Sequence, residues 1–494
     1  MLNESQCRKI IDAAIAHALS FSTKKKPIEA EVSISGSNLA TSRFANNEMT
    51  QNQAPDYNVV AVRLIRDGRQ ARLETLDLSE RGIERLVESA FEAVRLLEAD
   101  KDILPLASIK ELETNQKDKK KENQQEKAKN LGKEKNKEKE KNKAGDKSSD
   151  VAKQRFDSAT AELTALDRAK EVGKIIKQAE EQNVSSAGVY CSGEYYTSIG
   201  NSNGLFNFHR ESAAACSITI TADGATSWVL EHAPKAKEVK AEVLAERAIS
   251  KAKQARKPED LPPGKYLAIL EPAAVIDLLT YLWWDFSATS HIDKLSCLLD
   301  KVGEKVFGDN ITVTDDVTNI HQCGSPFDGE GVQRQVVTLV ENGVIKNLVH
   351  SRLSAKKMQT KTTGHSMAQP SAMGEMPLNI VIEGGISSIE DMMKQVQGDQ
   401  EAVLLTRVWY VREVDPATKL LTGMTRDGTF LVKNGAIVKP VKNLRFNVSL
   451  LELLNNVIAL GPSVRAAGAE GIEVPAVVPA MMVKDFNFTE GTRF

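Results

Sequence analysis

Residues 270–307 read LEPAAVIDLLTYLWWDFSATSHIDKLSCLLDKVGEKVF and lie just past the middle of a chain of 494 residues. The first half of this stretch predicts a helix, because its apolar residues recur on one face at helical spacing. That face consists of Val275, Leu278, Leu279, Leu282 and Phe286. We expect it to pack in a core, with Asp277 and Asp285 pointing toward solvent or a cleft. A polar loop then leads into strands.

The segments on either side of this stretch differ in character. A highly charged helix is predicted before it, at residues 237–256, and a cluster of prolines follows that helix. After it, short β-rich runs alternate with turns, and Asn342-Gly343 and Asn434-Gly435 are two-residue hairpin signals. Many short strands in regular succession favour a sandwich or a closed barrel, decorated here by predicted helices at residues 388–395 and 449–454.

The first 235 residues mix helix and strand patterns. Helices are predicted at residues 3–20, 77–98 and 157–182. Strands are predicted at residues 30–35, 57–65, 188–191, 195–199, 205–208 and 213–222, while the Asn-rich segment 42–52 indicates a loop or an edge strand. The fold class is therefore α+β. We predict an N-terminal mixed α/β domain at residues 1–235, a helical connector at 236–262 and a β-rich, barrel- or sandwich-like C-terminal domain at 263–494.

A lysine-rich segment at about residues 114–150 interrupts the first domain. Aliphatic and aromatic residues are nearly absent from it, so it cannot bury enough apolar surface to offset its ordering entropy, and we predict disorder. No aromatic residues interleave the charges, which favours a solvated insertion over a basic arm for nucleic acid.

Composition excludes several classes of protein. Charged residues make up 27 % of the chain and the formal net charge is −2, which gives no global attraction to nucleic acid or to an anionic membrane. Acidic and polar residues interrupt the first residues where a signal peptide needs an apolar core, and we expect a soluble, cytoplasmic protein. The five cysteines form no CxxC pair, which fits reduced thiols.

The usual catalytic motifs are absent from the sequence. No two of the seven histidines lie within five residues of each other, so HExxH and its relatives do not occur. Neither G-x-S-x-G nor a glycine-rich phosphate-binding loop is present. Two acidic groups, Asp315-Asp316 and Asp328-Gly329-Glu330, could supply oxygen ligands or acid–base groups. Both lie where turns are expected, and turns favour Asp and Gly for backbone reasons alone.

Several short blocks, taken together in their order and spacing, resemble the TldD/PmbA family of cytosolic peptidases over nearly the whole chain. The blocks are RFANNE at residues 43–48, VRLIRDGR at 62–69, NSNGL at 201–205, LDKVGEKV at 299–306, FDGEGV at 327–332, TTG at 362–364, and KNG at 433–435 with KPV at 439–441. The lysine-rich segment is not part of the family pattern. The resemblance implies an N-terminal α/β domain, a C-terminal barrel-like domain and a dimer whose chamber admits unfolded or short peptides.

In this family the catalytic TldD subunit carries an HExxxH motif on a helix that follows a turn containing proline. That turn resembles residues 270–272 here, and the motif positions then fall near Thr280, Tyr281 and Asp285. Both histidines and the glutamate are missing, and no cysteine follows Cys323 to complete a metal site near the C-terminus. Zinc needs about three ligands in close geometry, which one Asp cannot supply. The chain is thus more similar to PmbA, also called TldE, the subunit without metal.

The resemblance leads to one main hypothesis and two alternatives. The main one is a subunit with no catalytic residue and no metal of its own, paired with a zinc-containing TldD-type subunit and handling unfolded or short peptides. The alternatives are a peptide-binding or regulatory homodimer and a peptidase with a dispersed site, such as His321 with Asp315, Asp316 or Asp328; whether the chain is an enzyme stays open. No membrane or nucleic-acid partner is expected. Candidate cleft or structural residues are Arg43, Asn201, Asp316, Asp328 and Glu330.

Overall fold

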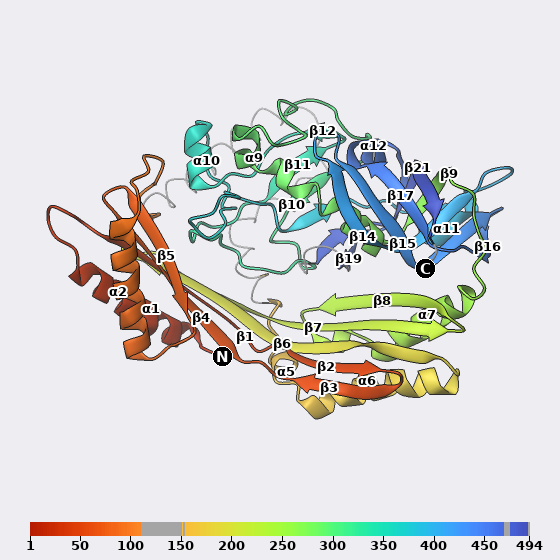
Figure 1. Ribbon diagram of the computed structural model, residues 1–494, viewed down its shortest axis with the longest axis horizontal. Coiled ribbons are helices and arrows are strands. Elements are labelled where there is room, and N and C mark those ends of the chain that lie inside the picture. Colours follow the sequence, from red (N-terminus) through yellow and green to blue (C-terminus); the bar gives the residue numbers. More distant parts are fainter. Residues whose placement is uncertain (110–150, 152–153, 469–474, 493–494) are drawn as a thin grey trace, which may run out of the picture.

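The computed structural model describes residues 1–109, 151, 154–468 and 475–492 (Figure 1). The segment predicted to be disordered, at about residues 114–150, lies outside the described residues. Figure 1 shows a long sheet from the first half of the chain curving beneath a more compact C-terminal half. Within the described residues, no helix is both long enough and apolar enough to cross a membrane.

An eight-stranded sheet organises the N-terminal half, in the order β3-β2-β6-β1-β4-β5, with β7 beside β6 and β8 beside β7. The strands are β1 (Glu29–Ser37), β2 (Ala40–Ala45), β3 (Glu48–Gln53), β4 (Tyr57–Arg66), β5 (Arg69–Thr75), β6 (Ser185–Asn201), β7 (Phe206–Ala222) and β8 (Ala225–Ala233). The Asn-rich segment 42–52 forms most of the β2–β3 hairpin. For this segment a loop or an edge strand was predicted, and β3 is an exposed edge strand.

Strands β6 and β7 form the spine of this sheet. They pair antiparallel along almost their whole length of 17 residues each, where the sequence predicted two short strands in place of each one. The separate predictions were wrong because the pairing of β6 with β7 continues without a break through the predicted gaps. One end of β6 pairs with β2 and the other with β1, so the same strand joins two halves of the sheet.

Helices cover the two halves of the sheet separately. One core combines α1 (Glu4–Ser20) and α2 (Glu80–Leu96) with β1 and β4, and another combines α6 (Ala165–Glu181) and α7 (Ala241–Gln254) with β6 and β7. The short helices α5 (Ser158–Ala161) and η2 (Ala236–Glu238) precede α6 and α7. Asn3 and Ser79 cap α1 and α2, within about two residues of the predicted helix starts.

The charged helix predicted at residues 237–256 is α7. Its Leu244, Ala248 and Ala252 are buried against the sheet, so the helix packs on the N-terminal half along its length. Val243, in the first turn of the same helix, is 61 % exposed. The division of the chain at residues 236–262 remains a prediction.

Two sheets build the C-terminal half. In one, β9, β21, β17, β15 and β14 close into a ring, because β14 pairs with both β15 and β9; β16 and β18 extend it. The other has the order β12-β11-β10-β13-β20-β19. The strands are β9 (Gly264–Leu270), β10 (Val313–Asp315), β11 (Val337–Glu341), β12 (Val344–Ile345), β13 (Ile380–Ile382), β14 (Ala402–Asp415), β15 (Leu420–Lys433), β16 (Ala436–Pro440), β17 (Leu444–Ser449), β18 (Val457–Leu460), β19 (Val464–Ala466), β20 (Ala476–Val478) and β21 (Met481–Gly491).

The predicted barrel-like architecture is confirmed by this ring, although the sequence did not reveal β9, β17 and β21, three of its five strands. The predicted helices at residues 388–395 and 449–454 correspond to α11 (Ile389–Lys394) and α12 (Leu450–Asn455). A further short helix, α10 (Arg352–Lys357), was not predicted.

The central stretch folds into three short helices rather than one. They are α8 (Pro272–Leu279), η3 (Trp283–Phe286) and α9 (Ala288–Ile292). The apolar face is buried in the largest core, as predicted. The expectation that Asp277 and Asp285 face solvent or a cleft was wrong, because both are fully buried. Asp285 is paired with a lysine, and Asp277 lies against Gly468, where an added Cβ would meet its Oδ1 at 2.1 Å.

Candidate functional site

The turn that the resemblance places before a catalytic helix links three elements here. Pro272 opens α8, where its missing N–H costs no hydrogen bond. Before it, the Glu271 carboxylate accepts a hydrogen bond from Lys251 Nζ of α7 at 2.6 Å and one from Thr406 Oγ1 of β14 at 3.3 Å. The start of α8 is thereby held to both halves of the protein.

The three motif positions do not converge on one point. Thr280 is the C-cap of α8, and Tyr281 donates its hydroxyl to the Val411 carbonyl at 2.9 Å. Asp285, the third, lies in η3 and is fully buried. The helix ends at Leu279, so these residues do not share the helical face that an HExxxH motif requires.

The Asp285 carboxylate is committed to groups within the chain. Lys419 Nζ lies 2.6 Å from its Oδ2, and the Cys297 N–H donates to its Oδ1 at 2.8 Å. Lys419 also contacts Glu413 Oε2 at 2.9 Å. Burial works against the charge on Lys419, but the hydrogen bonds with Asp285 and Glu413 outweigh it and raise the pKa of this amine. Burial and the neighbouring Asp285 raise the pKa of the Cys297 thiol, which stays protonated.

This arrangement does not fit a metal ion. Lys419 Nζ occupies Oδ2 and the Cys297 N–H occupies Oδ1 of the carboxylate that would have to act as a ligand. No group of three or more His, Cys, Asp or Glu side chains in the described part of the chain could hold a metal. The residues at this position supply a buried ion pair.

A second buried carboxylate, Glu375, holds the starts of two helices. Ser287 Oγ and the Thr289 N–H at the start of α9 donate to its Oε1 at 2.9 and 2.6 Å. The Ser351 N–H and Ser354 Oγ at the start of α10 donate to its Oε2 at 3.1 and 2.9 Å. A carboxylate with this many donors is fully satisfied, so Glu375 positions the two helices.

The turn at residues 327–332 joins the C-terminal half to the N-terminal sheet. Asp328 folds the turn by accepting the N–H groups of Glu330, Val332 and Ser366, each at 2.9 Å. The Gly331 carbonyl accepts Asn207 Nδ2 of β7 at 2.9 Å. A small apolar cluster seals the contact; it consists of Ala107, Ile199, Leu205, Phe327 and Val332.

Glu330 extends this turn into a buried chain of charges that we call the latch, formed by Glu31, Arg63, Glu330 and Arg352. Arg63 Nε lies 3.1 Å from Glu31 Oε1, its neighbour across β1 and β4. Arg63 Nη2 and Arg352 Nη1 lie 3.9 and 3.4 Å from Glu330 Oε1. All four side chains are at most 9 % exposed. The latch therefore connects the sheet to the C-terminal half with alternating charges.

Asp315, the first candidate for a dispersed site, is paired with a different histidine from the one proposed. Its Oδ1 lies 3.0 Å from His365 Nε2, and its Oδ2 accepts the N–H groups of Leu378 and Asn379 at 2.7 and 2.9 Å. Burial opposes ionisation, but His365 and Arg334 outweigh it and lower the pKa of Asp315. No sequence signal links these residues, because they are 50 positions apart.

The remaining predicted residues are dispersed. Asp316 accepts the N–H of Thr318 at 2.8 Å, and Asn201 Oδ1 accepts the N–H of Asn203 at 3.0 Å, so each holds a local turn. Arg43 is an exposed residue of β2. His321 is exposed, and in the described part of the chain no hydrogen bond or ion pair joins its side chain to Asp316 or to the other aspartates proposed for the site.

The pKa of Asp328 predicts that the free energy of unfolding depends on pH. Burial and the nearby Glu330 raise it to about 7, with the three N–H groups acting in the opposite direction. The pKa of Asp328 in the folded protein lies above its unfolded value of about 3.9. Between these two pH values the folded protein therefore holds a proton that the unfolded chain has released. The stability contributed by protonated Asp328 is lost as pH rises through this range. Relative to Asp328→Asn, the wild-type free energy of unfolding should fall by about 1.5 kcal/mol between about pH 5.5 and pH 7.

Urea denaturation at several pH values measures this difference. Asp77→Asn is the control, because Asp77 is exposed and hydrogen bonds from Ser79 lower its pKa, so that it is ionised in both states across the window. A difference between wild type and Asp328→Asn that stays constant with pH contradicts the assignment.

Family models match most of the chain. Residues 30–94 match one described as PmbA/TldA metallopeptidase domain 1, residues 150–256 match the PmbA/TldA metallopeptidase central domain, and residues 263–490 match the PmbA/TldA metallopeptidase C-terminal domain. The lysine-rich segment falls mostly between the first two matches.

Individual relatives cover parts of the chain. An uncharacterized protein of Methanocaldococcus jannaschii is 30 % identical over 268 residues, 54 % of this chain, and the Metalloprotease PmbA homolog of Haemophilus influenzae is 23 % identical over 296 residues, 58 % of this chain. The chain spans 62 % of the length of each of these two relatives. The crystal structure of TldE from Thermococcus kodakarensis has the same fold, with a TM-score of 0.76, 18 % identity, and coverage of 97 % of this chain and 100 % of that one.

Proposed function

Since the chain belongs to the PmbA/TldD metallopeptidase family, we propose that it is the subunit without metal of a TldD/TldE-type peptidase complex that acts on unfolded or short peptides. The observation that carries this proposal is the Asp285–Lys419 ion pair, which stands where the resemblance places a metal-binding motif. The zinc and the residues that cleave the peptide then belong to a TldD-type partner, and the complex works in the cytoplasm.

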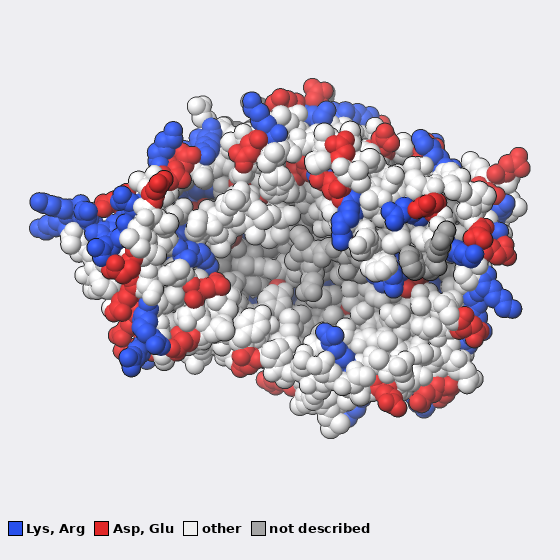
Figure 2. All heavy atoms as spheres, viewed as in Figure 1, with Lys and Arg blue, Asp and Glu red and all other residues white. Residues whose placement is uncertain are grey.

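The shape of the molecule supports the same proposal. Figure 2 shows one face hollowed between the N-terminal sheet and the C-terminal half, with charged side chains gathered mainly around its margin. A partner of similar fold placed against this face would enclose the hollow. The latch and the bond between Lys251 and Glu271 fix the angle between the two walls, which a chamber needs.

Metal content and activity test the proposal together. The chain should be expressed alone and with a TldD-type subunit from the same organism, and each preparation examined by size exclusion, elemental analysis for zinc and cleavage of an unstructured peptide. We expect the chain alone to be inactive and to carry far less than one zinc per molecule, and the mixture to elute as a heterodimer with zinc and activity. Stoichiometric zinc together with peptide cleavage by the chain alone would refute it. Failure to form a heterodimer would instead indicate the regulatory homodimer.

A further inference from the structure

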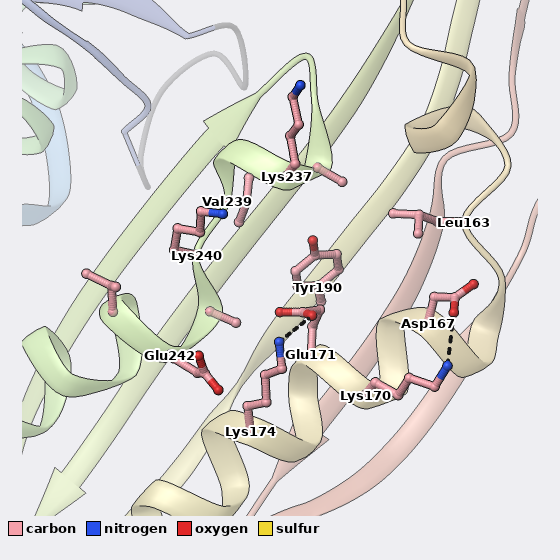
Figure 3. A pocket seen from close by; sticks show the side chains of 13 residues that line it. Leu163, Asp167, Lys170, Glu171, Lys174, Tyr190, Lys237, Val239, Lys240 and Glu242 are labelled. Atoms are coloured by element: carbon pink, nitrogen blue, oxygen red, sulfur yellow. Dashed lines mark hydrogen bonds and ion pairs between the residues drawn. The ribbon is translucent and has the colours of Figure 1, made fainter.

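A groove on the N-terminal half lies between α6 and the start of α7. It has a volume of about 450 Å³, and its lining comes from both helices, from η2, from residues just before each helix and from Tyr190 of β6 (Figure 3). Figure 1 shows α6 below the sheet, on the side away from the C-terminal half, so the groove is separate from the hollow described above. None of the residues discussed for the candidate site lines it.

The floor of the groove carries a tyrosine hydroxyl with no hydrogen-bond partner among the described residues. Tyr190 is only 1 % exposed, and within the described residues its hydroxyl makes no hydrogen bond. Figure 3 shows the hydroxyl pointing into the groove. Burial and the nearby Glu171 raise the pKa of Tyr190 well above its usual value, so it remains a neutral donor. A ligand oxygen in the groove can accept a hydrogen bond from this donor.

The first turn of α7 presents further donors to the same groove. Lys240 is the N-cap and its side chain makes no capping hydrogen bond. The N–H groups of Ala241, Glu242 and Val243, which line the groove, donate to no acceptor among the described residues. An uncapped helix N-terminus attracts anions through these N–H groups and the helix dipole.

The charges of the groove leave its α7 side positive. On α6, Lys170 lies 3.4 Å from Asp167 and Lys174 lies 2.7 Å from Glu171, so these pairs neutralise each other. Lys240 at the start of α7 forms no ion pair with any described residue. Figure 3 shows the Glu242 carboxylate on the side of Lys174, away from Lys240. An anionic group is therefore expected near Lys240 and Tyr190.

Apolar side chains complete the groove beside this anion site. Leu163 and Val239 flank the Tyr190 ring in Figure 3, and Ala236 also lines the groove. A ligand with a carboxylate next to an apolar group would satisfy the donors and bury its apolar part at once.

We propose that this groove binds the free C-terminal carboxylate of a short peptide with an apolar last residue. The carboxylate lies against the first turn of α7, with Lys240 and the Tyr190 hydroxyl as further donors, and the last side chain contacts Leu163 and Val239. The choice of a peptide as ligand rests on the proposed function, while the carboxylate site itself rests on the groove. The site would hold peptide ends outside the enclosed hollow.

Isothermal titration of the purified full-length chain with N-acetyl-Ala-Leu and with its C-terminal amide tests the proposal. We expect the free acid to bind, and the amide to bind at least tenfold more weakly because it lacks the charge. Tyr190→Phe, which removes only the hydroxyl, should weaken binding about tenfold. Lys240→Ser should weaken it similarly, since serine removes the ammonium and caps α7 itself. Lys177→Ser on the exposed face of α6 is the matched control and should change nothing.

Other results would overturn the proposal. Equal affinity for acid and amide, or binding unchanged in Tyr190→Phe, excludes a carboxylate at this site, and so does absence of binding up to about 10 mM. Tighter binding of inorganic phosphate than of the peptide acid would replace the peptide with a phosphate ligand. These titrations use the chain alone. A negative result therefore rules out the groove site without bearing on heterodimer formation or zinc content, which test the proposed function.

Discussion

Arg63→Met is expected to lower the free energy of unfolding by about 3–5 kcal/mol, because it leaves buried carboxylates without their central partner. Arg63 lies between Glu31 and Glu330, at 3.1 and 3.9 Å, and is 3 % exposed. Methionine retains much of the apolar stem, so the loss measures the charge rather than a cavity. Chemical denaturation followed by circular dichroism gives the change.

A surface pair provides the control for this prediction. Arg85 lies 2.9 Å from Asp77, but both side chains are largely exposed, and Arg85→Met should change stability by less than about 1 kcal/mol. Adding Glu31→Gln to Arg63→Met should recover part of the loss, since Glu31 then carries no uncompensated charge while Glu330 keeps its contact with Arg352. If Arg63→Met is no more destabilising than Arg85→Met, the latch does not hold the two halves together.

The latch also shows what the sequence could and could not predict. Arg63 belongs to the block at residues 62–69 and Glu330 to the block at 327–332, and both blocks contribute to the family resemblance. Single-sequence patterns place each on a strand or a turn, because alternation and turn residues are local signals. That the two blocks meet depends on how the sheet packs on the C-terminal half, and no local pattern encodes that contact.

The elements were predicted best where periodicity was long and undisturbed. Helices α1 and α2 and strands β1 and β4 lie close to their predicted positions. The central helix was predicted too long, because the apolar spacing from Val275 to Phe286 continues across Thr280 although the backbone turns there. Spacing reports which side chains are buried, and here an irregular chain buries them as well as a helix does.

The buried polar residues were the hardest to predict. Asp285 was expected near solvent because an aspartate in an apolar stretch usually lies outside the core. Its partner Lys419 is 134 positions away, so the sequence offers no reason to pair them. The same holds for Glu375, which accepts hydrogen bonds from two helix starts that precede it by 86 and 24 positions in the chain.

Lys419→Met is expected to lower the free energy of unfolding by about 3–5 kcal/mol, since it leaves the fully buried carboxylate of Asp285 without its cation. The lysine backbone has a φ of 50°, a strained conformation that methionine shares, so the substitution isolates the ion pair. Denaturation curves of the wild type and the variant at neutral pH measure the loss.

An exposed ion pair is again the control, because it loses the same charge without burial. Lys346 lies 3.1 Å from Glu341, with both side chains about half exposed, and Lys346→Met should cost less than about 1 kcal/mol at any pH. Combining Lys419→Met with Asp285→Asn should restore part of the stability, because the buried charge is then gone. A Lys419→Met variant as stable as Lys346→Met would mean that Asp285 finds another partner or water. The carboxylate would then be available to a ligand, and the reason for assigning this chain a role without metal would fail.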